Sequence, residues 1–162
     1  MARPRTKAAR SGGPLKDARV LVVEARFYND IADMLLKGAT RELRKAGSSF
    51  DCISVPGALE IPPAIAIALD AAEARGTPYD GVVALGCVIR GETSHYDIVA
   101  GESARGLMSI GMMHRLPVGN GILTVEDEDQ AVVRADPTQG DKGGSAARAA
   151  LALHALREQY AP

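Results

Sequence analysis

Aromatic residues and a surplus of either charge are what this 162-residue sequence most clearly lacks. It has no tryptophan, two phenylalanines and four tyrosines, so it offers few rings on which nucleic-acid bases could stack. Nineteen basic and twenty acidic residues leave a formal net charge of -1 at pH 7. A nucleic-acid-binding surface needs a basic surplus, and we therefore expect no nucleic-acid partner.

Long apolar runs and cysteine pairs are also scarce. The longest apolar run covers residues 64–69, far fewer than the ~20 residues of a membrane-spanning helix. No apolar segment follows the basic N-terminus, as it would in a signal peptide. Cys52 and Cys87 both lie in apolar, strand-like segments, which favours buried thiols over a disulfide or a metal site. We expect a cytoplasmic protein with no membrane segment and no bound metal.

Several common catalytic motifs are missing. The sequence contains no GxGxxG, GxxxxGKS/T, GxSxG or CxxC pattern, which argues against dinucleotide, P-loop, serine-hydrolase and thiol-redox chemistry. The acidic run at residues 126–129 lacks the central glycine and terminal glutamate of a calcium loop. It is better interpreted as a set of acidic residues at the N-terminus of a helix.

From residue 18 onward the sequence alternates between two apolar patterns. Strand-like runs occur at residues 20–23, 50–55, 81–87 and 118–125. Helical patterns cover residues 29–47, 62–76, 96–113, 127–135 and 145–160. Strands that alternate with helices form parallel sheets between helix layers. We predict an α/β fold, a three-layer αβα sandwich with a four-stranded parallel sheet and flavodoxin-like topology, in one domain at residues 18–162.

Three local features add to this plan. Residues 1–17 are basic and rich in glycine and proline, which predicts a flexible arm, either a solvated tail or a binding segment. The first helix should be capped by Asn29 or Asp30 and end at Gly47. The alanine-rich stretch at residues 146–155 suits either a seam between subunits or a helix buried within the chain.

Parallel sheets of this kind bind ligands beyond the carboxyl ends of their strands. Phe27 and Tyr28 follow the first strand, where a ring either stacks on a planar ligand or closes the mouth of the core. Glu60 stands between apolar residues after the second strand. Its carboxylate either accepts hydrogen bonds from a polyol or stabilises the N-terminus of the next helix.

The loop at residues 86–97 carries the clearest chemical signal. Gly91 and Thr93 precede a helix, where backbone amides and hydroxyls can hold a phosphate. His95 follows and suits general acid–base catalysis, with Asp97 as a candidate orienting carboxylate.

Other basic side chains lie further along the chain. Arg134 and Lys142 follow the fourth strand, and each is either a phosphate ligand or a solvated surface cation. His114 and His154 lie near predicted helix ends and are expected to have surface or capping roles.

Taken as a whole, the chain resembles the lumazine synthase family, which acts in the penultimate step of riboflavin biosynthesis. The segments that carry the resemblance are ARFY at 25–28, VPGALEIP at 55–62, LGCVIRGETSHYD at 85–97, GILTVE at 121–126, Arg134, and DKGG at 141–144. They are collinear and span nearly all of the chain after residue 17.

The resemblance implies how the first substrate, 5-amino-6-(D-ribitylamino)uracil, would be bound. The residues concerned are Phe27 as the stacking ring, Ala58, Leu59 and Glu60 around the ribityl chain, and Cys87, Val88 and Ile89 as a backbone edge that reads the uracil. Asn120 lies at the pocket rim, where some members have phenylalanine or tryptophan. That difference implies weaker retention of riboflavin but no loss of catalysis.

The resemblance also implies a site for the second substrate, 3,4-dihydroxy-2-butanone 4-phosphate. Glu92 and Thr93 match the loop on its phosphate side, His95 matches the acid–base residue, and Arg134 and Lys142 match cations that bind the phosphate. The implied transferase reaction is a condensation through imine formation, loss of phosphate and ring closure. It needs no cofactor and no metal.

The resemblance further implies a homo-oligomer built from rings of five subunits, and riboflavin synthase as a partner. The turn at residues 136–139 differs from that of capsid-forming members, so we expect a single ring or a pair of rings. Two other functions compete with catalysis. One is a flavodoxin-like module that binds a flavin without chemistry, and the other is a capsid-forming shell protein that retains only assembly.

Overall fold

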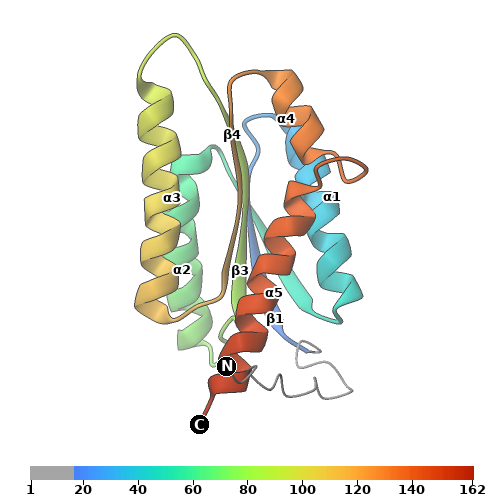
Figure 1. Cartoon of the computed structure of the whole chain (residues 1–162). Coiled ribbons are helices and arrows are strands. Elements are labelled where there is room, and N and C mark those ends of the chain that lie inside the picture. The colour runs from blue at the N-terminus through green and yellow to red at the C-terminus, as the bar shows by residue number, and fades with distance from the viewer. Residues whose placement is uncertain (1–16) are drawn as a thin grey trace, which may run out of the picture.

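The computed structural model describes residues 17–162, which form one four-stranded sheet with helices on both faces (Figure 1). The strands, all parallel and in spatial order β2-β1-β3-β4, are β1 (Arg19–Ala25), β2 (Ser49–Val55), β3 (Gly81–Ile89) and β4 (Val118–Val125). The helices are α1 (Asn29–Lys45), the 3-10 turn η1 (Ala58–Glu60), α2 (Ile61–Ala74), α3 (His95–His114), α4 (Glu128–Ala135) and α5 (Lys142–Tyr160). The predicted three-layer α/β sandwich is confirmed.

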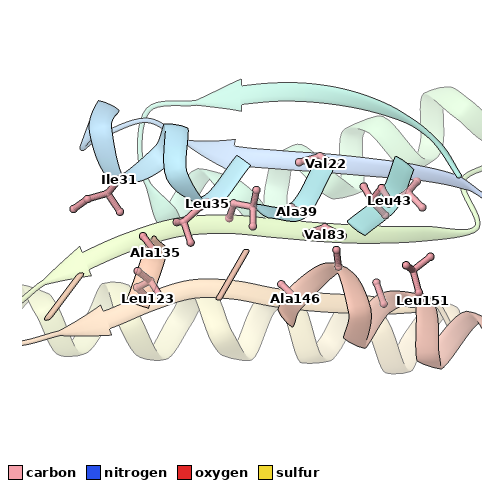
Figure 2. Close-up of a cluster of buried hydrophobic side chains, with 14 of the residues drawn as sticks. Val22, Ile31, Leu35, Ala39, Leu43, Val83, Leu123, Ala135, Ala146 and Leu151 are labelled. Atoms are coloured by element: carbon pink, nitrogen blue, oxygen red, sulfur yellow. The ribbon is translucent and has the colours of Figure 1, made fainter. Parts of the chain in front are cut away.

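Helices α1, α4 and α5 cover one face of the sheet, where the buried side chains form a continuous core (Figure 2). Val22 and Val83 of the sheet are fully buried there, together with Leu35 and Leu43 of α1. Helix α5 approaches α1 so closely that a side chain at Gly143 would overlap the backbone carbonyl of Leu35. Glycine is therefore needed at this position for the two helices to pack.

Helices α2 and α3 cover the other face and enclose a second core cluster. Ile61 and Ile65 of α2 are fully buried against strand residues such as Leu21. Helix α3 has 20 residues but buries only Ser103 and Leu107. No helix in residues 17–162 combines the length and apolar character needed to cross a membrane.

The start of α1 differs from the prediction in one detail. The helix begins at Asn29, but the N-cap residue is Tyr28, so neither Asn29 nor Asp30 caps it. Gly47, with a φ of 76°, follows its C-terminal end as predicted.

Several other elements extend beyond their predicted limits, and two of them, β3 and α5, bear on the site. Strand β3 runs past Cys87 to Ile89, because β4 continues to pair with it to that point. Helix α5 begins at Lys142, because the carboxylate of Asp141 accepts a hydrogen bond from the Gly144 amide and caps the helix earlier than expected.

Some predictions of burial were wrong. Cys52 is exposed because β2 is an edge strand, whereas Cys87 in the interior strand β3 is half-buried. His154 is buried rather than at the surface, because it lies one helical turn after Leu151 and Ala150 on the inward face of α5. The alanine-rich stretch packs within the chain through Ala146, Ala147 and Ala150. The arm predicted at residues 1–17 lies, apart from Asp17, outside the described residues.

Candidate active site

A cavity of about 390 Å³ opens beyond the carboxyl ends of β1, β2 and β3. This is the edge at which open parallel sheets bind their ligands. Its lining includes most of the predicted site, namely Phe27, Ala58, Leu59, Glu60, Cys87, Val88, Ile89, Thr93 and His95.

The first wall of the cavity is the turn between β1 and α1. The Phe27 side chain is 72% exposed, and its ring meets the ring of Tyr28 edge-on with 5.0 Å between centroids. Tyr28 is half-buried against the core, and this burial raises the pKa of its phenol. Tyr28 therefore closes the mouth of the core, whereas Phe27 leaves ring surface available to a planar ligand.

The second wall is the segment between β2 and α2. Ala58 is buried, whereas Leu59 and Glu60 are exposed. Glu60 occupies the N-cap position of α2, but its side chain makes no capping hydrogen bond. Its carboxylate lies over Gly57, where an added Cβ would be 3.1 Å from Oε2. The carboxylate is thus close to the positive end of α2 and also available to hydroxyl groups in the cavity.

The floor of the cavity is the end of β3. Strand β1 pairs with β3 only as far as Glu24 and Leu85, whereas β4 pairs with it as far as Ile89. On the β1 side, the backbone of Cys87 and Val88 therefore has no strand partner within the described part of the chain. The amide and carbonyl groups of this edge suit the hydrogen bonds of a flat heterocycle, as they would those of an added strand.

The Cys87 thiol at the floor of the cavity is not activated as a nucleophile. Burial raises the pKa of the Cys87 thiol to about 11, so the group is protonated at neutral pH. In residues 17–162, no group of three or more histidine, cysteine, aspartate or glutamate side chains is arranged to hold a metal ion.

The third wall is the loop from β3 to α3. His95 is the first residue of α3, and its backbone amide donates to Oγ1 of Thr93 at 3.3 Å. Both side chains line the cavity and are exposed. The positive dipole end of α3 therefore lies at the cavity, where it suits a phosphate group.

The loop is held by Arg90, and Asp97 has a different role from the one predicted. Asp97 forms an ion pair with Arg90 at 3.7 Å and, among the described residues, makes no hydrogen bond to His95. Arg90 Nε also donates to Glu126 at 2.8 Å, and the guanidinium lies 4.1 Å from the centre of the Tyr96 ring. These contacts tie the first turn of α3 to the ends of β3 and β4, and so position His95.

Four predicted site residues do not line this cavity. Glu92 is exposed in the third loop. Asn120 of β4 lies beside a second, apolar cavity of about 540 Å³ between α3 and α5. Arg134 and Lys142 are exposed on α4 and α5, and Arg134 donates to the backbone carbonyl of Gln130 in its own helix. One chain therefore assembles the uracil side of the predicted site without its phosphate-binding cations.

Sequence reasoning missed a charged cluster next to Phe27. Glu24 is only 4% exposed; it forms an ion pair with Arg26 at 2.9 Å and accepts a hydrogen bond from Ser54 Oγ at 2.9 Å. The available signal was a glutamate near the end of an otherwise apolar strand, because a buried carboxylate needs polar or charged partners.

Comparison with known proteins shows the family of the chain. Residues 17–158 match the family model described as 6,7-dimethyl-8-ribityllumazine synthase. A protein of that name from Rhodopseudomonas palustris (strain BisA53) is 55% identical over 161 residues, which cover 99% of each chain. A relative from Methylocella silvestris is 58% identical over 96% of this chain and 95% of its own. One from Rhizobium meliloti is 58% identical over 90% and 95%, respectively. The chain therefore belongs to the 6,7-dimethyl-8-ribityllumazine synthase family.

Proposed function

We propose that the cavity condenses 5-amino-6-(D-ribitylamino)uracil with 3,4-dihydroxy-2-butanone 4-phosphate to form 6,7-dimethyl-8-ribityllumazine. The observation that carries this proposal is the convergence of an exposed ring, an unpaired strand edge, a carboxylate and a histidine on one cavity of a chain from this family. The enzyme is a transferase of riboflavin biosynthesis. Residues 18–162 act as its single catalytic domain.

The uracil derivative occupies the inner part of the cavity. Its ring stacks on Phe27 and hydrogen-bonds to the free backbone edge at residues 87–89. Its ribityl chain runs along η1, where the Glu60 carboxylate accepts hydrogen bonds from the hydroxyl groups. A ring surface and a backbone edge both recognise a flat heterocycle without needing a charge on it.

The four-carbon phosphate lies toward the N-terminus of α3. Thr93 and the positive end of the helix dipole hold the phosphate on one side. Arg134 and Lys142 bind it from a neighbouring copy of the chain, because both are exposed and lie away from the cavity of their own copy. His95 lies beside the position of this substrate.

The chemistry then needs positioning and proton transfer. The 5-amino group attacks the ketone carbonyl and expels water to give an imine. Loss of inorganic phosphate and attack of the ribitylamino nitrogen with loss of a second water close the new ring. Holding both reactants together supplies an entropic advantage that reaches about 7–11 kcal/mol in well-oriented systems. His95 moves protons to and from the reacting nitrogen and oxygen atoms.

A homo-oligomer follows from the same proposal. Large apolar side chains are exposed on the part of the molecule formed by α3 and the end of α5, and these are Ile98, Met108, Met112, Met113, Leu153, Leu156 and Tyr160. An apolar patch of this kind marks a protein interface. The number of five subunits per ring comes from the family resemblance. We place the enzyme in the cytoplasm, with riboflavin synthase as a partner that uses its product.

The direct test mixes the purified protein with both substrates and follows the fluorescence of the lumazine. Formation of the product with release of one phosphate per lumazine supports the proposal. A module that only binds flavin would bind the product without forming it. A shell protein would assemble but do neither. Either result would reject the proposed catalysis.

The acid–base role of His95 is tested by the variant His95→Ala. The rate of condensation should fall on the order of a hundredfold, the low end for general acid–base catalysis, because positioning supplies much of the acceleration. Binding of the lumazine should change little. An unchanged turnover rate in His95→Ala would remove the assignment.

A further inference from the structure

The charged cluster beside Phe27 is more elaborate than a surface ion pair. Glu24 is the penultimate residue of β1 and is 4% exposed. Both of its carboxylate oxygens accept hydrogen bonds from Arg26 Nη1, each at 2.9 Å. Ser54, the register partner of Glu24 on β2, donates to Oε1 at 2.9 Å. The buried charge of Glu24 is thus fully partnered.

Arg26 makes a second set of contacts to α1 and β2. Its Nε donates to Oδ1 of Asn29 at 3.2 Å, and its Nη2 donates to Asp33. Its backbone amide donates to the carbonyl of Val55 at 3.1 Å. The two carboxylates that accept from the guanidinium raise its pKa above the usual value. One residue therefore joins the ends of β1 and β2 to the first turns of α1.

The side chain of Phe27, the next residue, makes few packing contacts that would fix its position. Its side chain is 72% exposed, and within residues 17–162 its ring contacts one other aromatic ring, that of Tyr28, its neighbour in sequence. A ring with so little packing is placed mainly by its backbone, and that backbone is fixed at Arg26 on one side and at the start of α1 on the other. Binding on a ring that is already placed avoids the ordering cost that a mobile ring would add.

We propose that Glu24, Arg26, Asn29, Asp33 and Ser54 form a clamp, here named the Arg26 clamp, that positions Phe27 for the planar ring of the substrate. The proposal rests on the proposed function. The members of the clamp do not touch the substrate, because none of the five lines the cavity. Arg26 is therefore a positioning residue that acts through Phe27.

The sharpest variant of the clamp is Arg26→Lys. Lysine keeps the positive charge next to buried Glu24, but a single ammonium group cannot reproduce the planar fork that reaches Glu24, Asn29 and Asp33 together. Asp33→Asn is the second variant. The Asp33 side chain is 67% exposed, so the fold tolerates this change even if Arg26→Lys does not fold.

The measurements are the KM for each substrate, the kcat, and the Kd for 6,7-dimethyl-8-ribityllumazine. In Arg26→Lys, the KM for the uracil derivative and the Kd for the lumazine should rise about tenfold, the low end of what a base–aromatic stack contributes. The KM for the butanone phosphate should stay within about twofold, because its site is built from other elements. Asp33→Asn should shift the same two constants in the same direction but by less.

A control uses an ion pair that joins β1 to β2 away from the cavity. Arg19 and Asp51 lie 2.8 Å apart at the opposite end of β1 and β2. Asp51→Asn should change none of the binding constants, although it also removes an Arg–carboxylate pair. A rise of both KM values by equal factors in Arg26→Lys, or a rise in Asp51→Asn to match it, would assign the clamp a purely structural role.

A double-mutant cycle identifies the route of the effect. In a Phe27→Ala background, Arg26→Lys should cause no further loss of lumazine binding, because the ring that it positions is absent. An undiminished tenfold loss in that background would overturn the proposal. Failure of the proposed function is separate, since it would appear as a wild-type protein that forms no lumazine at all.

Discussion

The two faces of the sheet differ in how much of their apolar surface the covering helices bury within the chain. On the face covered by α1, α4 and α5, the helices bury their apolar residues inside the chain. Gly143 lets α5 touch the backbone of α1, and Asp141 caps α5 while it pairs with Arg41 at 2.6 Å. Apart from Leu153, Leu156 and Tyr160 at the end of α5, Val133 is the one large apolar side chain described on these helices that is exposed. We call this the closed face.

The other face, covered by α2 and α3, is incomplete. Helix α3 buries only Ser103 and Leu107, and Met108, Met112 and Met113 are 64% to 75% exposed. Together with the end of α5, this helix borders the apolar cavity of about 540 Å³ that Asn120 also lines. We call this the open face. The closed face stabilises the single chain, and in the proposed homo-oligomer the open face is the surface that a second copy would cover.

The largest expected effect concerns sites shared between copies. Phe27→Ser should weaken binding of the uracil derivative about tenfold to a hundredfold, since a base–aromatic stack contributes ~1–3 kcal/mol. Arg134→Gln should weaken binding of the phosphate substrate to a similar degree, since hydrogen bonds to charged groups contribute ~1.5–3 kcal/mol. At substrate concentrations well below KM, each variant alone should then retain about a tenth of the wild-type activity or less.

Co-expression of these two variants tests the sharing directly. If Phe27 and Arg134 come from neighbouring copies, about a quarter of the sites in randomly mixed rings regain both residues. The activity should then approach a quarter of the wild-type value. If mixed assemblies form and remain as inactive as either variant alone, each site belongs to one chain.

The second prediction places a charge on the open face. Met112→Asp should disrupt the assembly and with it the activity, because an aspartate buried at an apolar interface loses its hydration without gaining a partner. The control is Ala149→Asp, which adds the same charge at an exposed position of α5 outside the open face. The native mass and the activity are measured for both variants, and we expect a loss of both in Met112→Asp alone. An intact, active Met112→Asp assembly would show that α3 faces solvent.

The third prediction compares one glycine from each face. Gly143→Ala should lower the free energy of unfolding by about 3 kcal/mol, because the added methyl group overlaps the α1 backbone and the core must shift. In Gly101→Ala on α3, the new Cβ has no atom of the described chain within 4 Å, so the helix should gain up to ~1 kcal/mol. Denaturant unfolding measures both. Equal losses would contradict the contrast between the faces.

The smallest effect concerns the two thiols. Burial raises the pKa of both thiols, that of Cys87 to about 11, but Cys52 is the more exposed of the two. The thiolate is the reactive form, so iodoacetamide at pH 8 should label Cys52 first, and Cys87 labelling should rise about tenfold per pH unit below 11. Bound lumazine should protect Cys87 and not Cys52. Mass spectrometry of digested protein gives both rates, and unfolded protein provides the control in which the two thiols react alike.

Most of the secondary structure could be predicted because it depends on local patterns. The strand at residues 118–125 was predicted despite Gly119 and Gly121, and the structure gives the reason for these glycines. A side chain at Gly119 would overlap the backbone of Ala146 in α5, and one at Gly121 would crowd Leu85 and the Ala84 carbonyl of β3 as well as Ala146. The pattern of apolar residues decides that a strand forms, and the close approach of α5 and β3 decides that glycine must occupy those positions.

The site was predicted in its parts but not in its assembly. The loops after β1, β2 and β3 converge on one cavity as the parallel topology requires. The pairing of Arg90 with Glu126, the exposure of Cys52 and the burial of His154 depend on contacts between elements distant in sequence. No local pattern reports such contacts.

The sequence by itself determined the α/β class, the order of the elements and the residues available for chemistry, because periodicity, turn residues and motif spacing are local properties of the chain. Only the tertiary structure decided which of those residues share a cavity and which stay apart. It placed Phe27 and His95 together and left Arg134 elsewhere on the surface. It also paired Glu24 with Arg26. Only burial in the packed sheet makes an unpaired carboxylate energetically costly, so only there does the carboxylate need a partner.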